Sequence, residues 1–553
     1  MTAGAIAPRR GGSAARDYLR CLSLANLHVV NVWLEVSNRG FDFFRASRPT
    51  ATMIVAAVTL VLLLSLVFWG TVQAWRLLPP RLSRPAAIIG ITVSVLIPLD
   101  ILHRSVLAGA MDRAIALFGR TTVQGAVGLV AAGLLVWLAV RTRAAIRVYG
   151  LALSLALPLA PILLGQAVWV QWQRPAGPHY AGTHAVDTRQ QAPTRMVVMI
   201  FDEWDQRLAI EERPDRIALP ALDRIVGQSF HASRVAGGGY LGVGSSIKSI
   251  LTGQRLKTVE PRSLGVRLDG ERREVVDPAA AWIESPTIFS ELAGRGWSTS
   301  IVGWYIPYCR LLGQYLRACA WQPGGSVYGR REFLFDLSYA QSLRTLAMRQ
   351  AERLPLSRTL GLESSIDERR QLLREELSRI RADVAAASDS ADFLYVHWPV
   401  PHPFGVDDGS AAARERRPNY LDNLVVADGL LSEFQERLTR EGRWDAVTLV
   451  LTADHSLRSR YWRGLGAWTD EEQRATGGRQ SPYVPFVVKF AGHHAPLAYD
   501  HPFTIALLYD VVLAIADGTV ASPADLAKWL DAHRGKHPTE VGPRRGAAVN
   551  SGT

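Results

Sequence analysis

Apolar residues are distributed in two different ways along the chain, and the change comes near Trp172. Before that position they form long uninterrupted runs with almost no charge, whereas after it they come in short bursts between Arg, Asp, Glu, Gly and Pro. Because a helix of about 20 apolar residues is long enough to cross a bilayer, this pattern predicts transmembrane helices within residues 51–174. The predicted membrane segments are 51–75, 85–102, 122–140 and 148–172.

Residues 1–50 precede these segments and form a basic, partly amphipathic region. Its stretch 19–36 is apolar enough to suggest a further helix, but it contains polar side chains that are costly to place in lipid. These are Asn26, His28, Asn31 and Glu35. The stretch is therefore either a fifth membrane helix or an amphipathic helix that lies along the membrane surface.

Two short connections between the predicted helices are rich in arginine. They carry Arg76, Arg81 and Arg84, and Arg141, Arg143 and Arg147. Because basic loops tend to remain in the cytoplasm, we expect both connections there and the chain after the last helix on the other side. This orientation requires an odd number of crossings, which the stretch 19–36 would complete. The sequence thus predicts a multi-pass protein of the cell (inner) membrane with an extracytoplasmic second half.

Two of the three cysteines, Cys309 and Cys319, lie close together in the second half of the chain. A close pair in an oxidising compartment can form a disulfide, which agrees with the expected extracytoplasmic position. The alternative is a pair of ordinary buried thiols.

After a linker at residues 175–194, the pattern changes to strand, loop and helix in repetition. Apolar runs without alternation are typical of parallel strands that are buried on both faces. The predicted fold is therefore a bundle of transmembrane α-helices followed by an α/β domain with a central, mainly parallel sheet at 195–530. The stretch 366–387, with helical spacing and alternating charges, is interpreted as an exposed helix in an insertion. Residues 531–553, which are polar and rich in Gly, Pro and Arg, are predicted to form a disordered tail.

Acidic and imidazole side chains follow three of the apolar runs. Asp202 and Glu203 follow the first run, His402 comes shortly after the second, and Asp454 and His455 come after the third. Ligands of open α/β sheets gather beyond the carboxyl ends of the strands, so these side chains are predicted to share one site. Carboxylate and imidazole ligands together suit zinc or manganese better than calcium. The three runs are 196–201, 393–396 and 447–451.

The net charge of +12 and the pI near 9.8 do not indicate a nucleic-acid partner. The sequence contains no basic helix, finger motif or set of stacking aromatic residues of the kind that binds nucleic acid. Membrane topology and anionic substrates account better for the charge. We therefore expect the lipid bilayer as a partner, together with an anionic lipid-linked or envelope substrate.

Five motifs in order resemble the sulfatase branch of the alkaline phosphatase superfamily over residues 195–518. The motifs are Val-Met-Ile-Phe-Asp-Glu, Ser-Ile-Leu-Thr-Gly, Tyr-Val-His-Trp-Pro-Val-Pro-His-Pro, Leu-Thr-Ala-Asp-His-Ser and Val-Pro-Phe-Val-Val. With the preceding apolar helices, the architecture is most similar to that of lipoteichoic acid synthases and lipid A phosphoethanolamine transferases. The resemblance implies a divalent metal held by Asp202 or Glu203 with Asp454 and His455, and His402 facing the substrate or the metal. Because a single Glu after the first strand binds the metal in the transferases, Glu203 is the favoured member of its pair.

The resemblance also implies a hydroxyl or modified Cys nucleophile at the start of the helix that leads into Leu-Thr-Gly. In this sequence the corresponding position is Val243, which has no nucleophilic atom. Ser245 and Ser246 are the nearest hydroxyls, after a glycine-rich lead, and are the candidate nucleophiles. Neither lies in the Cys/Ser-x-Pro-x-Arg context that sulfatases need for formylglycine formation, so a true sulfatase is disfavoured.

Three basic residues are candidates for binding the nonbridging oxygens of an anionic ester, because such oxygens need cationic donors in the transition state. They are Lys248, Arg458 and Arg460, each of which is otherwise a surface charge. Three histidines after the strand at 486–489 are candidates for a second metal site. They are His493, His494 and His501.

The leading hypothesis is a membrane-anchored, metal-dependent hydrolase or transferase of phosphate-type esters that acts on cell-envelope material through a hydroxyl nucleophile. The alternative is a catalytically silent sulfatase-like protein that binds an envelope polymer or partner.

Overall fold

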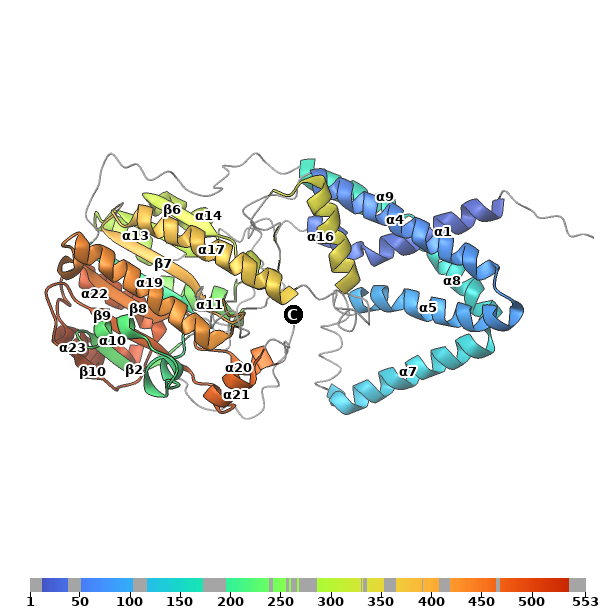
Figure 1. Cartoon of the computed structure of the whole chain (residues 1–553). Helices are drawn as coiled ribbons and strands as arrows, with labels where there is room; N and C mark the ends of the chain where they lie inside the picture. The colour runs from blue at the N-terminus through green and yellow to red at the C-terminus, as the bar shows by residue number, and fades with distance from the viewer. Residues whose placement is uncertain are drawn as a thin grey trace, which may run out of the picture.

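A computed structural model shows a bundle of apolar helices followed by an α/β domain (Figure 1), as the sequence predicts. The structure describes residues 12–37, 51–102, 117–172, 195–237, 242–254, 258–259, 266–267, 286–329, 331, 336–352, 365–389, 391–406, 418–463 and 468–536. The predicted linker and the end of the predicted tail lie outside the described residues.

The helix bundle contains three described helical stretches that are long and apolar enough to cross a membrane: Ala51–Arg76, Thr121–Val140 and Thr142–Val170. These stretches coincide with or overlap three of the four predicted membrane segments, whereas 85–102 lies in a helix that is described only in part. The bundle consists of α1 (Gly12–His28), α2 (Val30–Val36), α4 (Ala51–Arg76), α5 (Pro80–Leu102), α7 (Arg120–Val140), α8 (Thr142–Ala156) and α9 (Leu159–Trp172).

The stretch 19–36 forms parts of α1 and α2, and α1 packs along α4. Apolar residues such as Ala25, Val29 and Val32 are buried in this contact. Two of the polar side chains that made this stretch a weak membrane candidate, Asn26 and His28, have hydrogen-bond partners inside the bundle. The indole of Trp33 donates to Asn26 Oδ1 at 3.0 Å, so this costly polar group is satisfied.

The α/β domain is built on a nine-stranded mixed sheet within the described residues, in the order β10-β2-β9-β8-β1-β7-β5-β6 with β11 beside β2. All pairs are parallel except the two that involve β9 with β2 and with β8. The strands are β1 (Met196–Asp202), β2 (Phe230–Ala236), β5 (Thr299–Trp304), β6 (Ala318–Gln322), β7 (Phe393–Pro401), β8 (Thr448–Ala453), β9 (Tyr483–Lys489), β10 (Leu497–Tyr499) and β11 (Phe503–Thr504). The predicted central, mainly parallel sheet is thereby confirmed.

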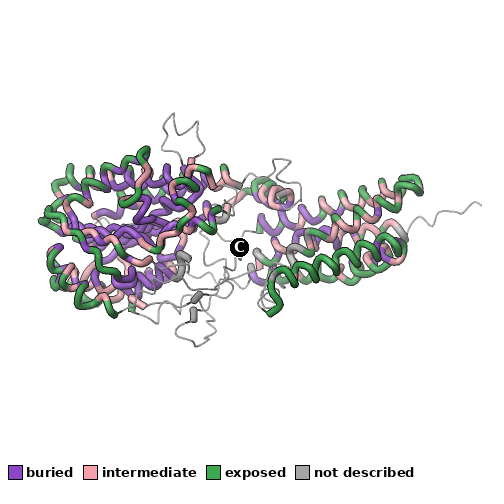
Figure 2. Tube along the Cα trace, turned by 90° about the horizontal axis from the view of Figure 1, so that it is seen from below, coloured by how far each residue is buried: buried purple, intermediate pink, exposed green. Residues whose placement is uncertain are grey.

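Every residue of β1, β7 and β8 is buried, because helices cover both faces of the sheet. Figure 2 shows these buried positions in the middle of the domain and exposed positions on the outer helices. One group of covering helices is α10 (Pro220–Val226), α17 (Ser365–Ala387) and α19 (Tyr420–Arg440), and the other is α11 (Gly242–Thr252), α13 (Ile288–Gly294) and α22 (Leu508–Ala516).

Helix α17 corrects the interpretation of 366–387 as an exposed insertion helix. It packs on β5, β6 and β7, and Leu373, Ile380 and Val384 on its inner face are buried in the core. The alternating charges follow its outer face only. An amphipathic helix that covers a sheet has the same charge pattern as a solvated one, which explains the error.

The predicted disulfide is present between Cys309 and Cys319, in α14 (Tyr308–Leu312) and β6. It joins a short helix after β5 to the neighbouring edge strand of the sheet. At the C-terminus, α23 (Pro523–His533) continues beyond the predicted domain boundary at residue 530.

Candidate metal and active site at the sheet edge

The central strands β1, β7 and β8 end at the same edge of the sheet. β1 lies between β7 and β8 and runs parallel to both, with Phe201 opposite Trp398 of β7 and Ala453 of β8. Residues that leave parallel neighbouring strands emerge at the same edge. Asp202 is the last residue of β1, and Asp454 directly follows β8. The register thus places the two carboxylates side by side.

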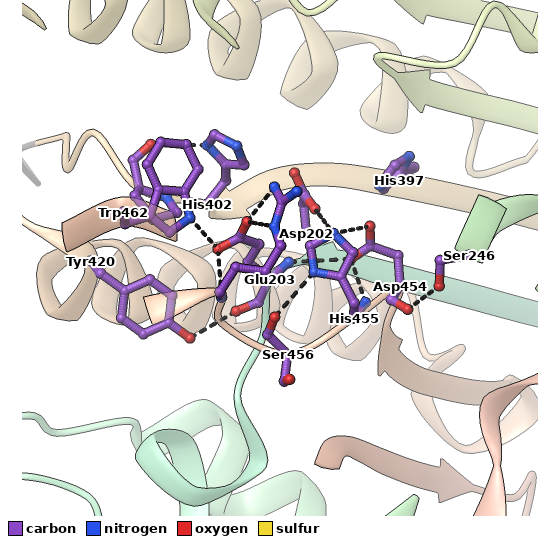
Figure 3. A network of polar contacts seen from close by, with 12 residues as sticks. Asp202, Glu203, Ser246, His397, His402, Tyr420, Asp454, His455, Ser456 and Trp462 are labelled. Atoms are coloured by element: carbon purple, nitrogen blue, oxygen red, sulfur yellow. Dashed lines mark hydrogen bonds and ion pairs between the residues drawn. The ribbon is translucent and has the colours of Figure 1, made fainter. Parts of the chain in front are cut away.

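Asp202, Asp454 and His455 form a compact group of metal-ligating side chains (Figure 3). One donor atom from each lies within 4.8 Å of the others. The His455 Nε2 atom is 3.3 Å from Asp454 Oδ2 and 3.8 Å from Asp202 Oδ1. All three side chains are buried. Of the predicted ligands, the structure therefore groups Asp202, Asp454 and His455.

The donor atoms of this group lack other partners, which is the property that a metal site requires. Both carboxylate oxygens of Asp202, Asp454 Oδ2 and His455 Nε2 are buried without a hydrogen bond. His455 Nδ1 lies 3.1 Å from the carbonyl of Ser456, so a proton on Nδ1 leaves the Nε2 lone pair facing the carboxylates. Burial and the nearby charge of Asp454 raise the pKa of Asp202. A divalent cation would satisfy all four atoms and offset the repulsion, so these residues fit the predicted metal.

Glu203 is turned away from this group by its backbone and is paired with arginine instead. Its φ of 62° lies in the left-handed region, which is rarely adopted by a residue with a side chain. Its carboxylate accepts from Arg458 Nε at 2.7 Å and from Trp462 Nε1 at 2.7 Å, and Arg458 Nη2 lies 2.6 Å from Glu203 Oε1. Burial raises the pKa of Glu203, but the Arg458 guanidinium and the neighbouring imidazoles bring it below its usual value. The geometry therefore favours Asp202 over Glu203 as a ligand.

His402 lies beside Glu203, outside the three-residue group. Its ring packs edge-on against Trp462, at 4.8 Å between centroids, and against Trp304. Its Nδ1 atom is 2.9 Å from the carbonyl of Pro403. Burial lowers the pKa of His402 to about 4, although the charge of Glu203 opposes this shift. His402 is therefore neutral at physiological pH and available as a hydrogen-bonding group near the site.

Ser246 comes close to the group of ligands from the start of α11. Its hydroxyl donates to the backbone carbonyl of Asp454 and is buried (Figure 3). The side chains of Val243 and Ser245 lie outside the described residues. Of the two candidate nucleophiles, the structure thus places Ser246 beside a predicted metal ligand.

Residues 365–518 match the Sulfatase family model. This part of the chain is similar to the sulfatase family. The match includes β7, α19, β8 and the two ligands that follow β8, and it confirms the resemblance inferred from the motifs. Comparison with curated proteins gives no match.

The chain is also similar to solved structures of low sequence identity. The phosphonate monoester hydrolase of Agrobacterium radiobacter is 16% identical, over 59% of this chain and 74% of that one, with a TM-score of 0.34. The lipoteichoic acid synthase LtaP from Listeria monocytogenes is 11% identical, over 58% and 71%, with a TM-score of 0.34. A protein of the alkaline phosphatase superfamily from Vibrio parahaemolyticus is 12% identical, over 59% and 67%, with a TM-score of 0.34.

The three basic residues proposed for oxyanion binding have different positions in the α/β domain. The Arg458 guanidinium is bound to Glu203, Lys248 is buried in α11, and Arg460 is exposed on α20 (Ser459–Trp462). Arg460 is thus the predicted cation that is open to solvent, whereas the charge of Arg458 is balanced by a carboxylate.

The prediction of a second site from the histidines after β9 is not supported by the topology. His493, His494 and His501 are exposed, and none belongs to the metal-ligating group found in the described residues. β9 runs antiparallel to β8, with Lys489 opposite Leu449. The end of β9, which is followed by His493 and His494, therefore lies at the edge of the sheet opposite the site. His501 instead follows β10, which is parallel to β2 and lies at the far side of the sheet from β1.

Two residues of the α/β domain near the site, His397 and Trp304, were missed in the sequence. His397 lies inside β7, with Nδ1 2.8 Å from the Tyr308 hydroxyl and Nε2 buried without a hydrogen bond. A Cβ at Gly303 would lie 2.2 Å from the Tyr308 ring, so glycine allows this contact. Trp304 packs against both His397 and His402. The available signal was the imidazole of His397 within an otherwise apolar strand.

Glu376 of α17 contacts Trp304 and leads to a prediction about the pH dependence of stability. Its buried carboxylate accepts from Trp304 Nε1 at 3.0 Å and from the hydroxyl and backbone N–H of Ser326. Burial raises the pKa of Glu376 from 4.5 to about 6. The protonated form is thus favoured in the fold, and the resulting stability is complete below pH 4.5 and is lost as the pH rises through about 6.

Glu376→Gln keeps an acceptor for Trp304 but cannot ionise. As the pH rises from 4.5 to 7.5, we expect the free energy of unfolding of the variant to increase by on the order of 2 kcal/mol relative to that of the wild type. Chemical denaturation of the full chain at the two pH values measures this difference. Glu375→Gln, a partly exposed neighbour paired with Arg331, is the matched control. A difference that does not change with pH would contradict the assignment.

Proposed function

We propose that the chain is a metal-dependent hydrolase or transferase of phosphate-type esters that acts on cell-envelope material. The observation that carries this proposal is the set of four buried donor atoms without partners, delivered by Asp202, Asp454 and His455 to the carboxyl edge of the sheet. Buried charges of this kind are stable only when they are paired or bind a metal. The similarity to the sulfatase family favours ester chemistry at this edge.

Asp202, Asp454 and His455 would hold a divalent zinc or manganese ion. Such an ion lowers the pKa of a nearby hydroxyl and neutralises developing negative charge on the ester oxygens. Ser246 is the proposed nucleophile, because its oxygen lies beside the Asp454 backbone at the start of α11, where the helix dipole also favours an anion. Its oxygen would form a bond to phosphorus as the bond to the ester oxygen breaks, and the serine proton would pass to the leaving alcohol. The oxygen of an acceptor alcohol or water would then bond to phosphorus as the serine oxygen leaves, and the proton of the acceptor would return to the serine.

His402 and Arg460 are the proposed groups on the substrate side. A neutral His402, whose Nδ1–H donates to the Pro403 carbonyl, presents the lone pair of Nε2, which can accept the proton of an incoming alcohol or water or can orient the acceptor hydroxyl. Arg460 is exposed next to the site loop and can bind an anionic head group. Arg458 acts on the substrate only indirectly, because it first neutralises Glu203.

We further propose that the helix bundle anchors the enzyme as a multi-pass protein in the cell (inner) membrane. In this orientation the basic connections lie in the cytoplasm and the α/β domain lies outside it. In Figure 1 the connection between α4 and α5 and the connection between α7 and α8 lie at the end of the bundle far from the α/β domain. The disulfide supports the oxidising side for that domain.

A specific observation favours a second candidate, a catalytically silent protein that binds an envelope polymer. The position where the family carries its nucleophile is Val243, and the Ser246 hydroxyl already donates to a carbonyl. Both candidate proteins are expected to bind a metal, but only the enzyme is expected to turn over an ester.

The deciding experiment uses the full chain in detergent, stripped by chelation and reloaded with zinc or manganese. We expect metal-dependent turnover of bis(p-nitrophenyl) phosphate and much slower turnover of p-nitrophenyl sulfate. Ser245→Ala combined with Ser246→Ala should reduce turnover by at least about 10³-fold, as loss of a nucleophile does. Ser249→Ala, on the same helix, is the matched control. Metal binding without turnover of any ester would favour the silent protein, and unchanged turnover in the double variant would exclude both serines.

A further inference from the structure

Helix α16 (Tyr339–Glu352) belongs by sequence to the second half of the chain, but it packs against α4 of the helix bundle. Leu346 of α16 is completely buried. It belongs to an apolar cluster whose other members come from the bundle, including Ala57 and Leu60 of α4 and Ala167 of α9. The α/β part of the chain thus contributes one helix to the core of the bundle.

The contact between α16 and α4 is made by one face of α16. Ser342, Leu346 and Gln350, which are four residues apart, are buried, while Arg344 and Ala347 are exposed. At the start of α16, the Tyr339 hydroxyl donates to Thr59 Oγ1 at 3.0 Å. Thr59 lies eight residues after the start of α4, at a depth of about 12 Å along the helix. The contact therefore lies in the outer half of an apolar helix that is long enough to span a membrane.

Burial along α4 agrees with this position. All seven buried residues of α4 fall between Met53 and Ser65, whereas Leu66 and Val67 are 52% and 61% exposed. The half of α4 nearest the α/β domain is thus buried more fully than the far half. Figure 1 shows α16 crossing this end of the bundle between α4 and the α/β domain.

The site lies on the same side of the α/β domain as this contact. In Figure 1, α20, which begins four residues after His455, is on the side that faces the bundle. The carboxyl edge of the sheet therefore points toward the end of the bundle that α16 covers.

We propose that α16 is a membrane-interface helix that docks the α/β domain on α4 and holds the site edge toward the bilayer. Its buried face fits the bundle, and its exposed face carries Arg344, a basic side chain of the kind that the lipid headgroup layer favours. A site held in this way reaches esters that are presented at the membrane surface. That last consequence rests on the proposed function, whereas the docking does not.

Crosslinking and accessibility test the docking in the full chain, reconstituted in nanodiscs of phosphatidylethanolamine and phosphatidylglycerol. A photoreactive benzoylphenylalanine at Leu346 should crosslink to peptides of α4, and one at the exposed Ala347 should not. A nitroxide on Ala347→Cys should show collision with a water-soluble relaxant that is several-fold lower than a nitroxide on Arg381→Cys, on the exposed face of α17. Equal accessibility at both positions, or no crosslink from Leu346 to α4, would overturn the proposal.

Leu346→Asp separates docking from chemistry. Turnover of phosphatidylglycerol in the nanodisc should fall about tenfold or more as the effective concentration of the site at the surface is lost. Turnover of soluble bis(p-nitrophenyl) phosphate should be unchanged. If the variant turns over each ester at the same rate as the wild type does, the positioning role of α16 is contradicted. If the wild type hydrolyses neither ester, the proposed function fails, and the crosslinks still decide the docking.

Discussion

His455→Ala is expected to reduce the affinity of the full chain for zinc or manganese by at least about 100-fold. Removal of a residue that only supports a metal ligand already lowers metal affinity 10–100-fold, and His455 is itself a proposed ligand. The imidazole Nε2 is the nitrogen donor of the group, between Asp202 and Asp454. Without it, two neighbouring carboxylates remain, which is a set that zinc prefers less. Equilibrium dialysis followed by elemental analysis measures the loss, and ester turnover should disappear with it.

A matched histidine shows whether this loss is specific. His494→Ala removes an imidazole that is exposed at the opposite edge of the sheet, so metal content should stay at the wild-type level. Asp202→Asn is expected to change metal affinity and metal-free stability in opposite directions. It should weaken metal binding, but it should raise the stability of the metal-free chain, because burial and the charge of Asp454 disfavour an ionised Asp202. Unchanged metal affinity in His455→Ala would refute the proposed ligand set.

The parts of the site that could be predicted are those that depend on strand direction. The apolar runs before Asp202 and Asp454 identify buried strands, and parallel strands deliver their last residues to one edge. The error at His493 has the same origin, because nothing in the apolar run of β9 distinguishes an antiparallel strand from a parallel one. The direction of one strand therefore decided whether the histidines after it were near the site.

The parts that could not be predicted depend on backbone conformation and on long-range packing. The left-handed turn at Glu203 exchanges the expected roles of two adjacent acids, and it is a property of φ that residue type does not reveal. The pairing of Glu203 with Arg458 follows from that turn. Likewise, the docking of α16 on α4 joins segments about 280 residues apart, and amphipathic spacing alone cannot name the partner of a helical face.

Arg458→Met is expected to destabilise the full chain by about 3–5 kcal/mol, because it leaves the buried carboxylate of Glu203 without its counterion. The remaining donor from a side chain, Trp462 Nε1, cannot neutralise the charge. Glu203→Gln in the Arg458→Met background should recover most of the loss, because an uncharged amide still accepts from the indole. Chemical denaturation of the two single variants and the double variant gives the coupling between the residues.

The same Glu203→Gln variant decides which acid after β1 belongs to the metal site. If Glu203 serves as the counterion of Arg458, the variant should bind zinc or manganese as the wild type does, while Asp202→Asn binds it weakly. The sequence resemblance favours the opposite result, in which Glu203 is the ligand. Since both carboxylates are fully buried and belong to adjacent residues, only the direction of their side chains separates the two outcomes. Strong loss of metal in Glu203→Gln would mean that this side chain leaves Arg458 and turns toward Asp454 when the ion binds.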